Sequence, residues 1–213
     1  MSHQYCSYVA TIVDASDVDK IYHDLHYGVR IEDDNELFCR LVMEINQAGL
    51  SWRTILVKEQ NFRKAYNNFD IKKVAKYDEK DFVRLMSDAG IIRNRLKINA
   101  AIYNANRLLE IQKECGSFRN WLDVEEEKMS RMYVSSSATT EDPVSSGKRN
   151  LDPSFRLDDK FSLKSLWLKE FKKNFKFVGG EIVGEFLMSI DMLSGSHGKE
   201  CVVYKKMAHK KKM

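Results

Sequence analysis

The chain has 213 residues, of which 43% are hydrophobic and 31% charged, and its net charge is +4. Its 11 Phe, 9 Tyr and 3 Trp can build a core, which excludes a chain that is disordered throughout. Its apolar runs fall far short of the ~20 residues that a membrane-spanning helix needs, and its first residues lack the basic-then-apolar order of a signal peptide. We therefore expect an intracellular protein, cytoplasmic if its source is bacterial, with no membrane partner.

The helices of the first half can be predicted from capping residues and hydrophobic spacing. We expect the first ~30 residues to be irregular. A helix is then predicted from Asp33 or Asp34 to Gly49, because aspartate caps the first turn of a helix and glycine ends the last one. Three further helices are expected after the capping residues Ser51, Asp70 and Asp78.

The second half continues with helices. A long one is predicted over 94–115, Gly116 ends it, and Ser117 caps the next. Helical spacing returns over 163–171 and in a last helix over 181–193. Because the whole chain has only two prolines, these long periodic segments predict an all-α fold.

Two segments differ in composition from the rest. Residues 134–153 hold both prolines and five serines but no aromatic residue, which predicts a mobile linker or insertion. Residues 202–213 hold five lysines and no acid, so they form a basic C-terminal tail. Outside the tail, 30 basic residues stand against 31 acidic ones, so the net positive charge belongs to the tail and is a weak argument for nucleic acid.

Glu44 is a candidate pocket acid. It stands in line with Leu37, Leu41 and Ala48 at helical spacing, so the apolar stripe of the predicted helix carries a carboxylate. Burying an ionised carboxylate is costly unless it is paired or used. From spacing alone, an acid at the edge of the core that reaches solvent is the commoner outcome, and a pocket acid is the alternative.

Residues that can bind a metal stand near both ends of the chain. His197 and Cys201 are four positions apart, and Cys6 and His23 stand near the other end. Two cysteines and two histidines would complete a tetrahedral zinc site. Three other histidines are also available, namely His3, His26 and His209. The spacing therefore does not select four ligands, and two polar ends with incidental thiols remain an alternative.

Two further features suit a nucleic acid. Aromatic residues that could stack on a base gather at Tyr5, Tyr8, Tyr22, Tyr27 and Trp52. Residues 88–97 link two predicted helices through a short glycine turn, and three cations follow near the N-terminus of the next helix, where a phosphate could bind: Arg93, Arg95 and Lys97. Ordinary core packing of the aromatic residues and a plain turn with solvated charges are the alternatives.

These motifs occur together in an order that resembles 3-methyladenine DNA glycosylase I, the constitutive bacterial type of the helix-hairpin-helix DNA glycosylases. The matching segments are YHDLHYGVR at 22–30, EINQAGLSW at 44–52, DAGIIRNR at 88–95, FKFVG at 175–179, and His197 with Cys201. The resemblance implies an all-α helix-hairpin-helix glycosylase fold, with a single glycosylase domain over 1–201, a zinc site that joins the two ends, and a mobile insertion at 134–153.

The resemblance also assigns roles by position. The ligands of one structural zinc ion would be Cys6, His23, His197 and Cys201. The catalytic pocket carboxylate would be Glu44, and the base would also contact Tyr22 and Trp52. The loop 47–51, through Gly49 and Leu50, would press into the gap left by a flipped nucleotide. The hairpin would contact DNA through Gly90, Arg93, Arg95 and Lys97.

The implied function is base-excision repair by a monomeric enzyme. Such an enzyme would flip 3-methyladenine out of alkylated double-stranded DNA and hydrolyse its N-glycosidic bond, leaving an abasic site. Aromatic faces and a carboxylate favour this base because it is cationic in DNA. The matching pocket segments contain no lysine, so we expect no lyase activity. The alternatives are a diverged member that binds damaged or distorted DNA without turnover, and a zinc-containing interaction module unrelated to DNA.

Several residues depart from the family pattern. Ile45 stands where a small residue is usual, Tyr8 and Tyr27 stand where tryptophan is usual, and Asp19 replaces an aromatic residue found in some members. These departures bear on the selectivity and activity of the pocket.

Overall fold

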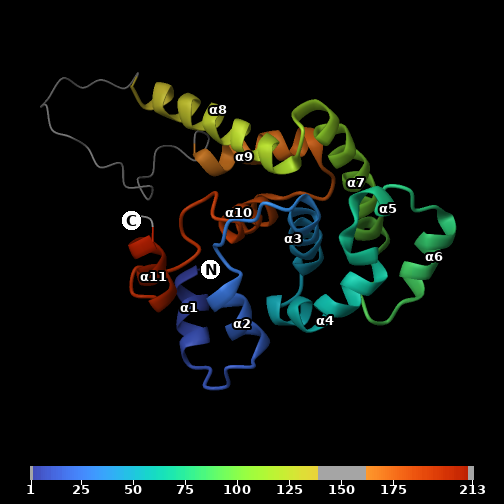
Figure 1. The fold of residues 1–213 in the computed structure, drawn as a ribbon, viewed down its shortest axis with the longest axis horizontal. Coiled ribbons are helices and arrows are strands. Elements are labelled where there is room, and N and C mark those ends of the chain that lie inside the picture. Colours follow the sequence, from blue (N-terminus) through green and yellow to red (C-terminus); the bar gives the residue numbers. More distant parts are fainter. Residues whose placement is uncertain (1, 139–161, 211–213) are drawn as a thin grey trace, which may run out of the picture.

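The computed structural model describes residues 2–138 and 162–210, and within these ranges the chain forms helices and no strand (Figure 1). The all-α prediction is therefore confirmed for the described residues. The helices in chain order are α1 Ser2–Ala10, α2 Val18–Leu25, α3 Asp34–Gln47, α4 Trp52–Ala65, the 3₁₀ helix η1 Asn67–Phe69, α5 Ile71–Val74, α6 Glu79–Ser87, α7 Arg95–Cys115, α8 Phe118–Ala138, α9 Leu163–Asn174, α10 Gly180–Ser189 and α11 Val202–Lys210. None of the described helices has the length and apolarity that crossing a membrane requires.

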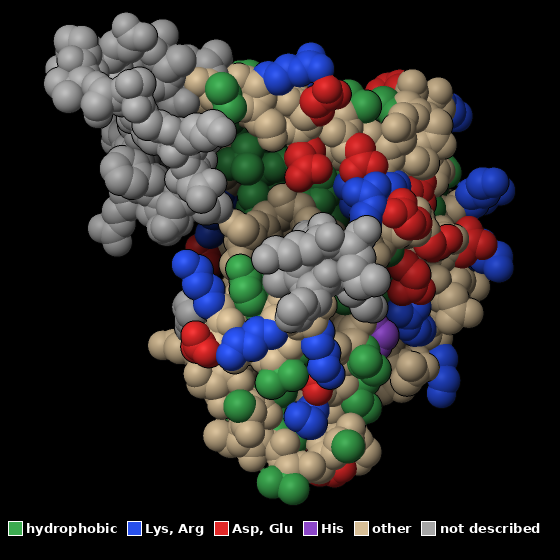
Figure 2. Space-filling view, turned by 60° about the vertical axis from the view of Figure 1, so that its left-hand side comes forward, with side chains coloured by type: hydrophobic (Ala, Val, Ile, Leu, Met, Phe, Trp, Pro, Cys, Tyr) green, Lys and Arg blue, Asp and Glu red, His purple; other side chains and the backbone are tan. Residues whose placement is uncertain are grey.

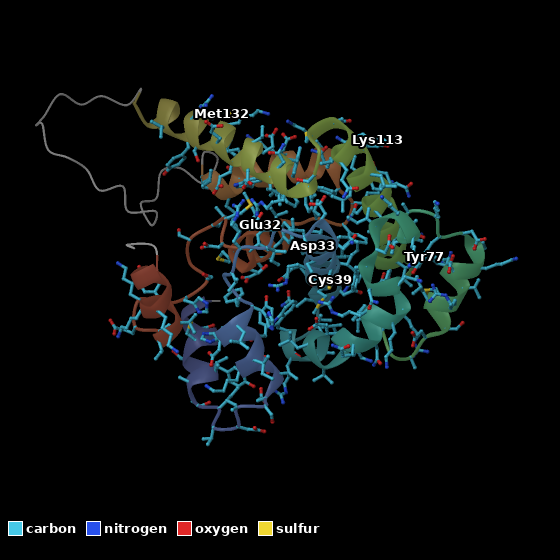
Figure 3. All side chains as sticks on the ribbon, in the orientation of Figure 1. Glu32, Asp33, Cys39, Tyr77, Lys113 and Met132 are labelled. Atoms are coloured by element: carbon cyan, nitrogen blue, oxygen red, sulfur yellow. The ribbon has the colours of Figure 1, made fainter. Side chains whose placement is uncertain are left out.

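Helix α3 lies at the centre of the molecule. Its N-cap is Asp33, whose side chain accepts a hydrogen bond from the backbone of Glu36. Leu37, Phe38 and Leu41 are completely buried on this helix, and Cys39, labelled on α3 in Figure 3, is buried with them. Because α3 is covered by other helices on several sides, its polar residues Glu44 and Asn46 are buried as well.

The helices between α4 and α8 begin where the capping residues predict. Ser51, Asp70 and Asp78 each accept a hydrogen bond from the first turn of the helix that follows. Asn94 does the same for α7, and Gly116 ends α7 with a φ of 84°. The sequence therefore predicted this half of the fold closely.

The prediction for the first thirty residues is wrong, because α1 and α2 lie there. Asp17 is the N-cap of α2, since its side chain accepts a hydrogen bond from the backbone of Asp19. The buried residues of α2 are the polar or amphipathic Asp19, Tyr22 and His23 rather than aliphatic ones. Val18, Ile21, Tyr22 and Leu25 do recur at helical spacing, but Ile21 and Leu25 are exposed, so this apolar stripe does not mark the buried face.

The boundaries of the predicted insertion and tail also change. Helix α8 runs to Ala138, so residues 134–138 are helical, and residues 139–153 of the predicted insertion lie outside the described residues. Residues 202–210 of the predicted tail form α11. Figure 1 places α11 beside α1, so the two ends of the described chain lie close together.

Candidate functional site

A cavity of about 270 Å³ lies among α1, α2, α3, α4 and α10. Its lining residues are Gln4, Tyr5, Tyr22, Tyr27, Glu44, Gln47, Trp52 and Glu185. The structure thus brings together the three residues that the resemblance assigned to the pocket, Tyr22, Glu44 and Trp52. Sequence reasoning had also singled out Tyr5 and Tyr27 as possible stacking residues, whereas it missed Glu185.

Glu44 is buried inside this cavity, with a relative exposure of 3%. Burial raises the pKa of Glu44 to about 8, the nearby charge of Arg40 lowers it, and that of Glu185 raises it. The Glu44 carboxyl group therefore holds a proton at neutral pH unless a cation enters the cavity. A cationic ligand would favour the ionised form, because an opposite charge stabilises a carboxylate.

Aromatic rings form the walls around Glu44. The ring centroids of Tyr22 and Trp52 lie 5.0 Å apart, and those of Tyr22 and Tyr27 lie 5.7 Å apart. Arg40 fixes Tyr22 from outside the cavity, because its Nη1 donates to the Tyr22 hydroxyl at 2.7 Å and its Cζ lies 4.8 Å from the ring centroid. Nε1 of Trp52 is buried and has no hydrogen-bond partner among the described residues. The cavity therefore offers aromatic faces and a carboxyl group.

Glu185 brings a second carboxyl group into the cavity from α10. The hydroxyl of Tyr27 donates a hydrogen bond to Oε2 of Glu185 at 3.1 Å. Burial raises the pKa of Glu185, and the hydrogen bond from Tyr27 opposes this shift. In the sequence Glu185 belongs to an amphipathic helix far from Glu44, so neither spacing nor a motif signals that it lines the cavity.

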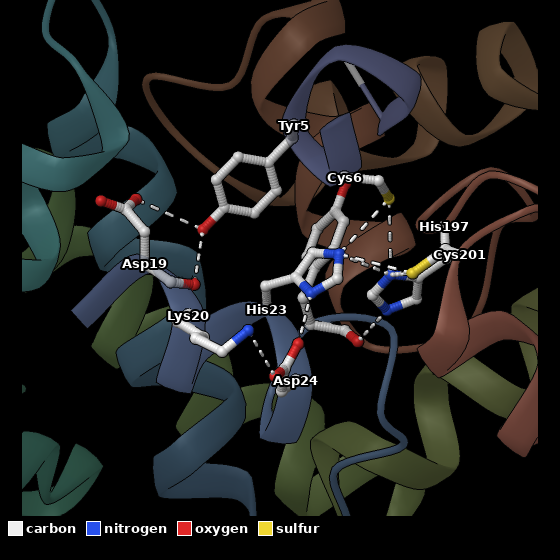
Figure 4. A network of polar contacts seen from close by, with 9 residues as sticks. Tyr5, Cys6, Asp19, Lys20, His23, Asp24, His197 and Cys201 are labelled. Atoms are coloured by element: carbon white, nitrogen blue, oxygen red, sulfur yellow. Dashed lines mark hydrogen bonds and ion pairs between the residues drawn. The ribbon is translucent and has the colours of Figure 1, made fainter. Parts of the chain in front are cut away.

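A polar network holds the cavity's outer wall in place (Figure 4). The Tyr5 hydroxyl lies 3.2 Å from the backbone oxygen of Asp19 and 3.4 Å from its Oδ1. Nη1 of Arg53 donates to Oδ2 of Asp19 at 2.6 Å and to Oδ1 of Asp17 at 2.9 Å. Asp19, which departs from the family pattern, is thus a buried acid that ties α1, α2 and α4 together.

The four predicted metal ligands also meet in the structure. Figure 4 shows Cys6, His23, His197 and Cys201 converging from α1, α2 and the segment before α11. Nε2 of His23 lies 3.2 Å from Nδ1 of His197, 3.3 Å from Sγ of Cys6 and 3.7 Å from Sγ of Cys201. Nδ1 of His197 lies 3.8 Å from Sγ of Cys6 and 3.7 Å from Sγ of Cys201.

These distances fit a metal ion at the centre of the four atoms. Tetrahedral zinc, with Zn–N of about 2.0–2.1 Å and Zn–S of about 2.3 Å, sets neighbouring ligand atoms about 3.3–3.8 Å apart. The outer ring nitrogens are also occupied: Nδ1 of His23 lies 2.7 Å from Oδ1 of Asp24, and Nε2 of His197 lies 2.9 Å from the backbone oxygen of Tyr27. Such outer contacts orient histidine ligands toward a metal. The donor set therefore suits zinc.

The predicted hairpin lies between α6 and α7. Arg93 and Arg95 are exposed there, and Gly90 is partly exposed. A Cβ atom at Gly90 would lie 2.9 Å from Oδ1 of Asp88, so the tight turn favours glycine at this position. Two exposed arginines thus lie at the N-terminus of α7, where the helix dipole also favours an anion. The guanidinium of Arg95 packs over the ring of Phe82, with its Cζ 4.9 Å from the ring centroid.

The prediction that Lys97 contacts DNA is wrong. Its side chain turns inward and is 4% exposed. Its Nζ donates to the backbone oxygens of Asn46 and Ala48, at 2.8 Å each. In the sequence, a lysine in the first turn of a helix suggests a contact with a phosphate. In the structure, the ammonium group of Lys97 instead binds carbonyl groups at the C-terminal end of α3, so it is unavailable to DNA.

The loop 47–51 lies beside the cavity mouth, since Gln47 lines the cavity. Gly49 has a φ of 82°, a backbone conformation that favours glycine. The Leu50 N–H donates to the Gln47 oxygen at 2.7 Å, and the Leu50 side chain is 40% exposed. A tight turn therefore presents an exposed apolar side chain next to the cavity.

Charges of both signs are mixed on the surface. On the face drawn in Figure 2, Lys and Arg side chains alternate with Asp and Glu rather than forming one broad basic area. Elsewhere in the described chain, opposite charges are paired directly, for example Arg63 with Glu36 and Arg30 with Asp123. A nucleic-acid contact on this face would therefore depend on individual cations.

Comparison with known proteins identifies the family. The family model of methyladenine glycosylase matches residues 12–204, so the chain belongs to the methyladenine glycosylase family. The DNA-3-methyladenine glycosylase 1 of Escherichia coli (strain K12) is 34% identical over 185 residues, which are 86% of this chain and 89% of that protein. The resemblance predicted from the sequence motifs is thus confirmed.

Solved structures agree with the observed fold. The 3-methyladenine DNA glycosylase I of Staphylococcus aureus has a TM-score of 0.68 at 27% identity, covering 96% of this chain and 98% of its own. A variant of 3-methyladenine DNA glycosylase I in complex with 3-methyladenine also has a TM-score of 0.68, at 28% identity, covering 94% of this chain and 97% of its own.

Proposed function

We propose that this protein is a DNA glycosylase that releases 3-methyladenine from alkylated double-stranded DNA in base-excision repair. The observation that carries the proposal is the buried carboxyl group of Glu44, which shares one small cavity with the rings of Tyr22 and Trp52. The names of its relatives and the bound 3-methyladenine in one similar structure support this assignment. The alternative of a member that binds DNA without catalysis is not favoured.

The chemistry of the cavity fits release of a cationic base. A base must leave the duplex to be attacked, and a cavity of about 270 Å³ can take one flipped base. In the cavity, the positive charge of 3-methyladenine would lie against aromatic faces and the Glu44 carboxylate, which favours it over neutral adenine. Because a cationic base is already a good leaving group, binding and orientation supply most of the catalysis, and water attacks the sugar carbon.

We infer that the product is an abasic site with an intact strand. Strand cleavage by a glycosylase needs an amine that forms a Schiff base with the sugar. The described residues that line the cavity include neither lysine nor arginine. The enzyme is therefore monofunctional, without lyase activity.

On the DNA side, we assign two contacts. Leu50, on the turn made by Gly49, would fill the gap left by the flipped nucleotide. Arg93 and Arg95, after the turn at Gly90, would hold a phosphate with the N-terminus of α7, as the hairpin does in helix-hairpin-helix glycosylases. The partner is duplex DNA, and the enzyme acts as a monomer.

We further propose that one structural zinc ion joins the ends of the chain through Cys6, His23, His197 and Cys201. The ligand-atom distances support a closed site with four protein ligands and no position for a catalytic water. When bound, the ion would supply stability. Because ligands from both ends share it, we place the single glycosylase domain over residues 1–201, with α11 appended.

The test is an assay of base release. DNA alkylated with a methylating agent is incubated with the protein, and the free bases are separated by chromatography. We expect 3-methyladenine to appear with the wild-type protein and to fall strongly with Glu44→Gln. Tight binding to alkylated DNA with no base released would contradict the proposal and favour a binding protein.

A further inference from the structure

We propose that Glu185, oriented by the hydroxyl of Tyr27, is a second base-recognising carboxylate of this pocket and makes it specific for cationic alkylated purines over neutral ones. The inference rests on the proposed function and deepens it. It concerns a residue that no sequence motif identified and that comes from α10, a helix that packs against α3.

The first argument is the placement of Glu185. Its side chain lines the same cavity as Glu44. The negative charge of Glu185 raises the pKa of Glu44. The Glu185 side chain receives one hydrogen bond within the described part of the chain, from Tyr27 at 3.1 Å. A single donor leaves most of the acceptor positions of a carboxylate open, because it can accept about four hydrogen bonds.

The second argument is the cost of this arrangement. Two carboxyl groups in one partly buried cavity disfavour each other's ionisation and lose hydration. The nearby charge of Arg40 offsets part of this cost for Glu44, and that of Lys164 offsets part of it for Glu185. A cationic ligand in the cavity would offset more of it, because a positive charge favours the ionised form of a nearby carboxyl group.

The third argument is the role of Tyr27. Its ring lies 5.7 Å from Tyr22 and 5.4 Å from His197, so its position is fixed by the pocket wall and the metal cluster. From this ring the hydroxyl donates to Oε2 of Glu185, and none of the other described residues donates a hydrogen bond to this carboxyl group. The Tyr27 hydroxyl therefore orients the Glu185 carboxyl group at the wall of the cavity that both residues line.

The chemistry that Glu185 would recognise follows from these contacts. The ligand must carry delocalised positive charge, and it must present an N–H donor at the edge facing α10. A purine methylated on a ring nitrogen has both features, since its exocyclic amino group donates and the ring carries the charge. A neutral purine has the donor but lacks the charge, so it gains less from a second carboxylate.

The experiment compares a cationic and a neutral version of one lesion. One duplex carries 3-methyladenine, and base release from it gives kcat/KM. The other carries 3-methyl-3-deazaadenine, the neutral isostere, and its Kd is measured by fluorescence anisotropy. We expect Glu185→Gln to lower kcat/KM for 3-methyladenine about tenfold while it changes the Kd of the neutral duplex by less than about twofold.

Two more variants make the result specific. Tyr27→Phe keeps the ring but removes the donor, so it should lower kcat/KM for 3-methyladenine about threefold and change the Kd of the neutral duplex by less than about twofold. Glu127→Gln is the control, because Glu127 is exposed on α8, pairs with Arg131 and does not line the cavity. It should leave both readouts unchanged.

The outcomes separate the two proposals. Equal loss on the cationic and neutral duplexes would mean that Glu185 only supports the fold, and no loss on either would mean that it does not face the base. Both results contradict this inference while 3-methyladenine release by the wild-type protein continues. Absence of release by the wild-type protein would contradict the proposed function and, with it, this inference.

Discussion

Lys97 and Ala48 are joined by a hydrogen bond of 2.8 Å from the ammonium group of the lysine to the backbone oxygen at the end of α3. The same ammonium group binds the oxygen of Asn46, so it holds the backbone on both sides of Gln47, a cavity-lining residue. A cation at the C-terminus of a helix is also favoured by the helix dipole. One side chain thus connects the start of α7, beside the hairpin, to the loop beside the pocket.

Replacing Lys97 with methionine should weaken both the fold and the activity. Met fills a similar volume but cannot donate, so two carbonyl groups lose a charged partner. We expect the free energy of unfolding to fall by about 2–3 kcal/mol and base release to fall because the loop 47–51 loses its anchor. Urea unfolding and the release assay measure these effects. Lys113→Met is the control, since Lys113 is exposed on the same helix (Figure 3). Equal stability of the two variants would contradict this role.

Removal of one metal ligand should reduce metal content and stability together. We expect close to one zinc ion per wild-type chain, and little in Cys201→Ala or His23→Ala, because a tetrahedral structural site needs all four ligands. Elemental analysis of protein purified without added metal, together with thermal unfolding, measures both quantities. Cys115→Ala is a control, since its thiol lies outside the cluster. Full stability of the wild-type protein after complete removal of the metal would contradict a structural role.

Glu44→Gln should make the protein more stable at pH 8 than the wild type. The pKa of Glu44 is about 8 in the folded protein and 4.5 ordinarily. Between these values the folded state binds a proton that the unfolded state has released, so the free energy of unfolding of the wild type falls as pH rises. The variant has no carboxyl group at this position, so its free energy of unfolding does not fall in this way. At pH 8 it should exceed that of the wild type by an amount on the order of a few kcal/mol.

The same variant should be within about 0.5 kcal/mol of the wild type in stability at pH 4.5, because Glu44 is then protonated in the folded state and about half protonated in the unfolded state. Its base release should fall in spite of the added stability, since an amide cannot supply the charge that the cationic base needs. Urea unfolding at the two pH values and the release assay test both statements. A stability difference that does not depend on pH would contradict the raised pKa of Glu44.

Arg93 and Arg95 should act on DNA binding rather than on the pocket. Changing either to alanine should weaken binding to duplex DNA and reduce the slope of log Kd against log salt by roughly 1, as expected for the loss of one phosphate contact. Binding of free 3-methyladenine should be unchanged. Arg131→Ala is a matched control, because Arg131 is exposed on α8 and pairs with Glu127. An unchanged salt slope in both hairpin variants would remove this segment from the DNA interface.

The sequence predicted the helices that carry their own capping residues and a regular apolar stripe. α3, α4, α6 and α7 begin at Asp33, Ser51, Asp78 and Asn94, where a side chain accepts from the first turn. α1 and α2 were missed because they are short and their packing depends on tyrosine, histidine and cysteine contacts with distant segments. Short helices of this kind depend on tertiary contacts rather than on local preference.

The candidate site was predictable only in part for the same reason. Tyr22, Glu44 and Trp52 lie in segments whose motifs resemble a family, so their meeting in one cavity could be expected. Glu185 and Lys97 could not be placed, because spacing along one helix does not say which other helix covers each face. Lys97 was assigned to DNA from its charge and its position in the first turn, and the structure turns it toward α3 instead.

The Cys/His cluster also connects the pocket to the C-terminal part of the described chain. His23 follows Tyr22 directly in the chain, and the backbone oxygen of Tyr27 lies 2.9 Å from Nε2 of His197. Two wall residues of the pocket are therefore held beside a cluster that includes His197 and Cys201. A truncation that removes residues 197–201 should consequently loosen the wall of the pocket as well as the cluster.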